Sequence, residues 1–221
     1  PDYSEENNKL NLEIKKKNYS ILVKHKCKKI ISMGSCWEYG SYLGKIKEDI
    51  RLNKSLNDFA KTKIKVLDHL KYLSHTNAIT YIWLRIFFVY GPYTKKTSLL
   101  HSIIDQYKKN KTVKLKNYNG SHDYIFVNDV ISAIKLCAFR KLDSGIYNVG
   151  SGKSTSNLVF LEEFNKLVGI SQNMFDKKGI SLGNTLIANN KKLFEVVGWF
   201  PKFTISDGLS ITLKKLGIYV E

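Results

Sequence analysis

The chain is poor in cysteine, arginine and proline, and these shortages argue against several classes of protein. Its three cysteines, Cys27, Cys36 and Cys137, lie far apart and form no C-x-x-C pair, so neither a disulfide framework nor a zinc ribbon is predicted. Proline occurs only three times, while apolar residues make up 43% of the chain, which is typical of a folded globular protein. We therefore expect a folded protein of a reducing compartment, located in the cytoplasm.

The chain also lacks a long uninterrupted apolar segment. Its most apolar stretch, ITYIWLRIFFVYG from Ile79, contains Arg85, and the polar first residues PDYSEENN do not have the layout of a signal peptide. We therefore expect neither a membrane span nor a membrane partner. The chain begins with Pro1 and not with methionine, which favours a fragment of a longer protein.

Acidic residues are few, with 19 against 36 basic residues, so the formal net charge is +17 and nucleic acid is a partner to consider. Almost all of the excess is lysine, because only Arg51, Arg85 and Arg140 are arginines. Lysine lacks the bidentate fork that specific phosphate and base contacts use. No repeated basic-aromatic motif is present, so we interpret the charge as a lysine-rich solvated surface and expect no nucleic-acid partner.

Helical and strand patterns alternate up to a strong breaker at Gly91-Pro92. Helices are predicted over about 5–25 and 58–75, and short buried strands over 29–33 and 79–86. This order predicts a parallel sheet covered on both faces. After Pro92 the pattern predicts helices near 98–109, 128–140, 156–168, 191–197 and 206–216, two β-rich runs around an Asn119-Gly120 turn, and a strand in GIYNVG.

The loop GSCWEYG follows the first predicted strand and holds several candidate side chains. A G-x-S-x-G nucleophile at Ser35 would need glycine at positions occupied by Met33 and Trp37. Cys36 has no nearby histidine and is interpreted as a packing residue. The five histidines of the chain show no metal-binding spacing, so no metal site is expected.

The segment GSGKST, residues 150–155, resembles the end of a phosphate-binding P-loop. The full motif needs a glycine five residues before Gly152, and that position holds Tyr147. We therefore interpret the segment as a turn between a strand and a helix, and not as an ATP or GTP site.

A more specific pattern follows in NDFAKTK. Phe59 and Lys63 are four residues apart on one helical face, so both can point to the strand end that carries Ser35. With this pair, the chain resembles the extended short-chain dehydrogenase/reductase family, the NAD(P)-dependent sugar-nucleotide epimerases, dehydratases and reductases. GSCWEYG resembles the family's serine or threonine loop, and FAKTK its Tyr-x-x-x-Lys helix.

The resemblance covers nearly the whole chain. WLRIFFVYGP, SHDYIFVNDV, YNVGSGKSTS and VVGWFPKFTISDGLSITLKK resemble later family segments, and NLEIKKKNYSILVKHKCKKIISMGS places Asn11 at a structural asparagine. The implied fold is α/β, with an incomplete doubly wound, Rossmann-type parallel sheet. Residues 1–91 would be the C-terminal part of a dinucleotide-binding domain, and 92–221 a smaller α+β substrate-binding domain with segments that pack back on the sheet.

The resemblance implies an NAD(P)-dependent epimerase or reductase that acts on a nucleotide-linked sugar. In the family, a tyrosine moves a proton on or off a sugar oxygen, a lysine lowers the pKa of that tyrosine and holds the nicotinamide ribose, and a serine binds the reacting oxygen. Ser35 and Lys63 hold two of these positions, but Phe59 holds the position of the tyrosine and has no proton to exchange. Loss of such a group costs about 10²- to 10⁴-fold in rate, which leaves open whether the chain is an active enzyme.

The resemblance also implies substrate contacts. Phe88 replaces a family asparagine, and His122 replaces an arginine that commonly contacts the diphosphate of the substrate. Cys36 and Trp37 replace the acidic residues of the dehydratases, which favours the epimerase or reductase branch. A nucleotide-sugar is the expected partner, and the resemblance leaves a homodimer open.

The family's glycine-rich loop, which seats the cofactor pyrophosphate at a helix N-terminus, is not in this sequence. We therefore expect NAD or NADP to bind the full-length protein and not this chain alone. The alternative hypothesis is a catalytically inactive, truncated relative that acts as a binding or interaction subunit.

Overall fold

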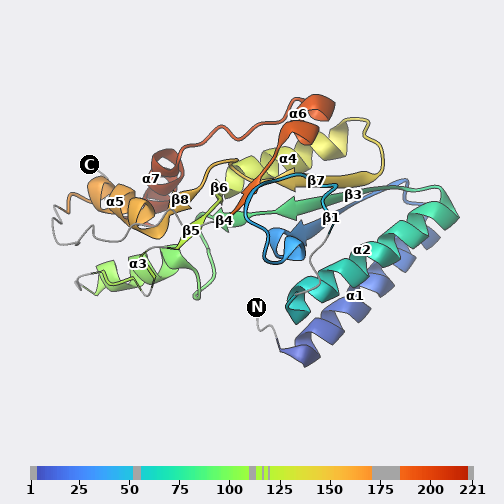
Figure 1. The fold of residues 1–221 in the computed structure, drawn as a ribbon, viewed down its shortest axis with the longest axis horizontal. Coiled ribbons are helices and arrows are strands. Elements are labelled where there is room, and N and C mark those ends of the chain that lie inside the picture. The colour runs from blue at the N-terminus through green and yellow to red at the C-terminus, as the bar shows by residue number, and fades with distance from the viewer. Residues whose placement is uncertain are drawn as a thin grey trace.

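The computed structural model describes residues 4–51, 56–109, 113–115, 117–118, 120–170 and 185–218. Its centre is a three-stranded parallel sheet of order β1-β3-β7, formed by Lys29–Ser35, Thr80–Ile86 and Gly145–Val149. Ser35 is in register with Ile86, and Ile86 with Val149, so the three strands end level. Their carboxyl ends therefore form one edge of the sheet (Figure 1).

Both faces of the sheet are buried because its side chains alternate between two hydrophobic clusters. On β3, Ile82 and Leu84 belong to one cluster, and Trp83 between them belongs to the other. Helices α1 (Glu5–Lys24) and α2 (Asp58–Asn77) lie side by side over the Trp83 face, and α4 (Val127–Phe139) covers the opposite face (Figure 1). The expected parallel sheet with two covered faces is confirmed.

The start of α2 is fixed by a side-chain cap. Asn57 is the N-cap and its side chain accepts a hydrogen bond from the Ala60 N–H at 2.8 Å, which satisfies one of the free donors of the first turn. Ala60, Leu67 and Leu70 are buried along one face of the helix. The cap fixes where α2 begins, and the buried face fixes its rotation about its own axis. Side chains of its first two turns can therefore point to the carboxyl edge of the sheet.

A third hydrophobic cluster lies beyond that edge. Helices α3 (Leu99–Lys108), α5 (Asn157–Leu167) and α7 (Ile205–Lys215) surround it. The described residues also form three pairs of short strands: β2 (Gly44–Ile46) with β9 (Leu186–Ala188), β4 (Phe88–Tyr90) with β6 (Tyr124–Phe126), and β5 (Ser121–His122) with β8 (Thr155–Ser156). The remaining elements are the 3-10 turn η1 (Cys36–Tyr39) and helix α6 (Lys191–Val197).

Most predicted elements are confirmed to within about two residues. The prediction of two β-rich runs around Asn119 is wrong for the first run, because residues 113–115 belong to no strand. Asn119 itself lies outside the described residues. The three-residue strands β2 and β9 were missed because so short a run shows no period. The domain boundary after Gly91 stays a prediction; β7, which follows it in the chain, is the third strand of the sheet.

Candidate active site

Ser35 is the last residue of β1 and the N-cap of η1. Its Oγ accepts a hydrogen bond from the Trp37 N–H at 3.3 Å, and its own N–H donates to Glu38 Oε1 at 2.7 Å. Ser35 and Glu38 also form a Ser-x-x-Glu capping box, in which the Ser35 side chain accepts from the Glu38 backbone and the Glu38 carboxylate accepts from the Ser35 N–H. Ser35 is therefore held by both its backbone and its side chain at the carboxyl edge of the sheet.

Phe59 and Lys63 lie one turn apart at the start of α2, as the sequence predicts. Lys63 Nζ donates to the Met33 carbonyl oxygen at 2.9 Å, and it lies 5.6 Å from the centroid of the Phe59 ring. Burial lowers the pKa of Lys63. Since an ammonium has three donors and Met33 takes one, Lys63 can also bind hydroxyl groups of a ligand.

A cavity of about 680 Å³ opens at this edge of the sheet. All the residues predicted for catalysis or substrate contact line it: Ser35, Phe59, Lys63, Phe88 and His122. They come from β1, α2, β4 and β5, which are far apart in the chain. The volume lies in the range of small-molecule sites, so the cavity is the candidate active site.

Phe88 and His122 form an aromatic wall of the cavity, with ring centroids 4.0 Å apart. Within the described part of the chain, His122 Nδ1 is buried and has no hydrogen-bond partner. Burial lowers the pKa of His122, so the ring is neutral at pH 7. The position expected to hold a diphosphate-binding arginine thus holds an uncharged ring.

Asn11, the expected structural asparagine, is exposed on α1 and does not line the cavity. The asparagine that α1 buries is Asn8, which is 5% exposed. The structure therefore brings together every predicted site residue except Asn11.

Tyr39, Tyr42 and Tyr90 lie on loops and strands around this edge of the sheet, but of these three only Tyr90 lines the cavity. Their hydroxyl groups donate to other parts of the protein: Tyr39 to Asn148 Oδ1 at 2.7 Å, Tyr42 to the Arg51 oxygen at 2.7 Å, and Tyr90 to the Thr204 oxygen at 3.2 Å. Burial raises the pKa of Tyr39 to about 12, which makes proton release harder still. None of the three supplies the missing acid/base group.

The interpretation of Cys36 as a packing residue fits its surroundings. Its side chain is buried, and burial together with the charges of Asp123 and Glu38 raises the pKa of its thiol to about 12. A thiol of that pKa is a weak nucleophile because it is not ionised at pH 7.

In the described residues, no group of three or more His, Cys, Asp or Glu side chains could hold a metal ion. No helix of that same part of the chain is long and apolar enough to cross a membrane.

The GSGKST turn is filled by a carboxylate of the protein. Asp123 is 0% exposed and accepts hydrogen bonds from the N–H groups of Ser151, Gly152 and Ala188, and from Ser151 Oγ at 2.6 Å. The amide groups that would cradle a phosphate in a P-loop are therefore occupied. This geometry explains why the motif is a structural turn.

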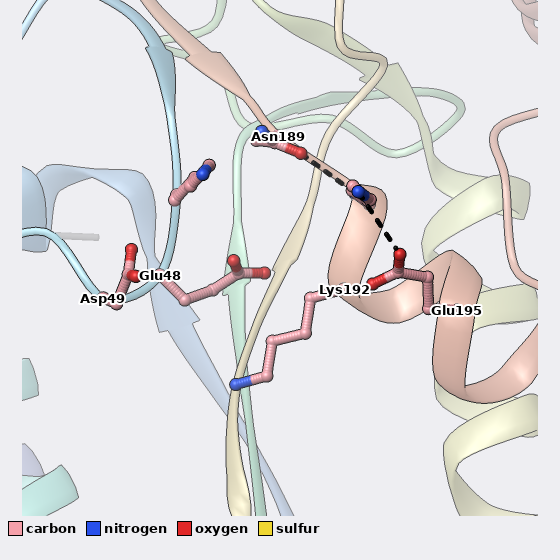
Figure 2. Close-up of a pocket in the computed structure, with 7 residues that line it drawn as sticks. Glu48, Asp49, Asn189, Lys192 and Glu195 are labelled. Atoms are coloured by element: carbon pink, nitrogen blue, oxygen red, sulfur yellow. Dashed lines mark hydrogen bonds and ion pairs between the residues drawn. The ribbon is translucent and has the colours of Figure 1, made fainter.

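A second hollow of about 350 Å³ lies between the segment after β2 and helix α6 (Figure 2). Its polar groups bind other parts of the protein: Lys192 Nζ donates to the Ile146 oxygen at 2.8 Å, Lys191 pairs with Glu195 at 3.5 Å, and Glu48 accepts from the Asn148 N–H at 2.8 Å. None of the predicted site residues lines this hollow, and we assign no function to it.

Fold and site together define an α/β protein with a cavity at the carboxyl edge of a parallel sheet, lined by a strand-end serine and a helical lysine. The model of the NAD dependent epimerase/dehydratase family matches residues 3–150. The chain therefore belongs to this family, and the resemblance seen in its sequence is confirmed.

Curated relatives carry related names. CDP-abequose synthase from Salmonella typhimurium is 31% identical over 156 residues, which cover 66% of this chain and 51% of the relative. UDP-glucose 4-epimerase from Lactobacillus helveticus is 26% identical over 198 residues, which cover 77% of this chain and 58% of the relative. The chain spans about half the length of the first of these relatives.

Solved structures share the fold. UDP-glucuronic acid 4-epimerase from Bacillus cereus, in complex with UDP-glucuronic acid and NAD, has a TM-score of 0.80 at 21% identity, covering 93% of this chain and 68% of that one. A tyrosine-to-phenylalanine mutant of this enzyme, in complex with UDP-4-deoxy-4-fluoro-glucuronic acid and NAD, gives the same values. The expected doubly wound α/β class is confirmed.

Proposed function

We propose that the chain forms the catalytic edge and sugar-binding cavity of an NAD(P)-dependent epimerase or reductase that acts on a nucleotide-linked sugar. One observation carries the proposal: Ser35, Lys63 and the Phe59 ring line a single cavity at the carboxyl edge of the sheet. The names of the relatives support the substrate class, since they include a CDP-sugar synthase and a UDP-glucose epimerase. In this proposal residues 1–91 serve the dinucleotide and residues 92–221 the substrate.

The side chains present fit the nicotinamide end of such a cofactor. Lys63 is anchored by Met33 and keeps donors for ribose hydroxyl groups. Hydride transfer to or from a sugar carbon is the chemistry that a bound NAD or NADP would supply. Ser35 orients the reacting sugar oxygen through its hydroxyl, and the aromatic wall of Phe88 and His122 packs against the apolar parts of the substrate.

Phe59 favours a second function, which is binding of a nucleotide-sugar without turnover. The ring has no exchangeable proton, and the nearby hydroxyl groups of Tyr39, Tyr42 and Tyr90 bind elsewhere. The Bacillus cereus mutant supports this alternative, because that protein binds both NAD and a nucleotide-sugar analogue with a phenylalanine in place of a tyrosine.

Phe59→Tyr separates the two functions. A tyrosine at this position would lie one turn from the Lys63 ammonium, which lowers the pKa of a phenol and prepares it for proton transfer. In the full-length protein, we expect turnover of UDP-glucose or UDP-glucuronic acid with NAD to rise by about 10²- to 10⁴-fold. Turnover is followed by nicotinamide absorbance and by chromatography of the sugar products, after calorimetry has shown whether each ligand binds.

Phe88→Tyr is the matched control, because it adds a hydroxyl to the same cavity without the helical register to Lys63. We expect no comparable gain from it. Normal binding of both ligands with no gain in Phe59→Tyr would favour the binding subunit, and failure of both ligands to bind the full-length protein would contradict both functions.

A further inference from the structure

Beneath the cavity lies a buried carboxylate that the sequence alone leaves without a role. Glu38 is 0% exposed and accepts hydrogen bonds from the Ser35 N–H at 2.7 Å, Trp83 Nε1 at 3.1 Å and Arg85 Nε at 2.8 Å. Arg85 is also buried, so the two charges form an ion pair away from water. Burying such a pair is unfavourable unless its geometry is good and its remaining polar atoms are bonded, as they are here.

The close approach of Glu38 depends on Gly34. A Cβ atom at this position would lie 2.5 Å from Glu38 Oε1 and 2.2 Å from Trp83 Nε1. The strand end is thus held at two points, because Glu38 binds the backbone of Ser35 while Lys63 binds the backbone of Met33. Ser35 and Lys63, the two side chains that line the cavity for the proposed catalysis, are therefore both positioned by this short piece of β1.

Glu38 also acts on Lys63 through its charge. Burial lowers the pKa of Lys63, the Glu38 carboxylate raises it, and the ammonium groups of Lys15 on α1 and Lys95 before α3 lower it. Among these charged groups, which are those that act on Lys63 in the described chain, Glu38 alone is negative. It opposes effects that would otherwise favour a neutral amine.

We propose that Glu38 is a positioning residue of this site: through its bond to the Ser35 N–H it fixes the end of β1, which presents Ser35 to the cavity and anchors Lys63 through the Met33 carbonyl oxygen. The proposal deepens the proposed function and rests on it for the catalytic meaning of Ser35 and Lys63. Glu38 itself does not line the cavity, so it acts through its neighbours.

The test is a measurement that needs no turnover. The chain and its Glu38→Gln variant are labelled with acetic anhydride over a range of pH, and mass spectrometry gives the midpoint of labelling for each lysine. We expect the midpoint of Lys63 to fall in Glu38→Gln, while that of Lys192 on α6 stays unchanged. Glu195→Gln on the exposed surface of α6 removes an equal charge and should leave Lys63 unchanged.

Glu38→Gln leaves the Arg85 charge buried without its partner and can fail to fold. The double variant E38Q/R85Q leaves no unpaired buried charge, and we expect the labelling midpoint of Lys63 to fall in it as in Glu38→Gln. In an active background such as Phe59→Tyr, we expect kcat to fall by about 10- to 100-fold, more than KM changes, because Ser35 is displaced. An unchanged Lys63 midpoint in a folded variant would overturn the proposal, whereas failure of the proposed function would leave this midpoint readable.

Discussion

Two glycine-serine turns lie at the carboxyl ends of the outer strands of the sheet, Gly34-Ser35 on β1 and Gly150-Ser151 after β7, and they differ in use. Each is held by a buried carboxylate that accepts backbone N–H bonds, Glu38 in the first and Asp123 in the second. Ser35 lines the cavity, whereas the Ser151 hydroxyl donates to Asp123 at 2.6 Å.

The difference follows from the origin of the carboxylate. Glu38 comes from the same turn, three residues after Ser35, and binds its backbone from below the cavity. Asp123 comes from the neighbouring β5-β6 segment and occupies both the amides and the hydroxyl of the Ser151 turn. Two similar dipeptides therefore serve different purposes, one for a ligand and one for the fold.

The largest expected effect is that of Asp123→Ala. The change leaves the buried N–H groups of Ser151, Gly152 and Ala188 without an acceptor, so we expect the free energy of unfolding to fall by about 3–5 kcal/mol. Urea denaturation followed by circular dichroism measures it. Asp68→Ala, at an exposed helical pair, should change the value by less than about 0.5 kcal/mol; equal effects would contradict the role of Asp123.

The sequence predicts the sheet, the main helices and the two-element site of Ser35 and Lys63, because these rest on periodicity and on local spacing. It does not predict the partners of Glu38 or Asp123, which are brought close by the fold: Arg85 is 47 residues from Glu38, and Ala188 is 65 residues from Asp123. The Ser-x-x-Glu pattern at Ser35 was the local signal for the cap, yet it gave no hint of the buried arginine. The role of Asn11 remains an expectation from resemblance.

The next effect tests whether both turns need a glycine beside the carboxylate. A Cβ atom would lie 2.5 Å from Glu38 Oε1 in Gly34→Ala and 2.7 Å from Asp123 Oδ2 in Gly150→Ala. We expect each variant to lose about 1–3 kcal/mol of stability through overpacking. Gly145→Ala, whose Cβ would lie 3.4 Å from its nearest neighbour, is the matched control and should be close to neutral. No loss of stability in either variant would show that neither turn needs a glycine beside its carboxylate.

The two serines should separate stability from ligand binding. Ser151→Ala removes the hydroxyl bond to Asp123 and should lower the free energy of unfolding by about 1–2 kcal/mol without changing the affinity for a UDP-sugar. Ser35→Ala removes the hydroxyl that caps η1, worth about 0.5–1 kcal/mol, but should weaken UDP-sugar binding. Denaturation measures the free energy of unfolding of each variant, and calorimetry measures its affinity for a UDP-sugar. Equal changes of stability and affinity in the two variants would show that the two turns do not differ in use.

The smallest effect concerns His122, which precedes Asp123 and faces the cavity while Asp123 faces the Ser151 turn. Because burial lowers the pKa of His122 below its ordinary value of 6.5, the unfolded chain binds this proton more readily than the folded chain. Its contribution to stability is therefore present above pH 6.5 and is lost as the pH falls through the lowered pKa. In His122→Phe, which keeps a ring beside Phe88, we expect a smaller loss of stability between pH 7 and pH 5, measured by urea denaturation. The loss should not vanish, because burial also lowers the pKa of His69; an unchanged pH dependence would mean that His122 accepts its proton in the folded cavity as readily as in water.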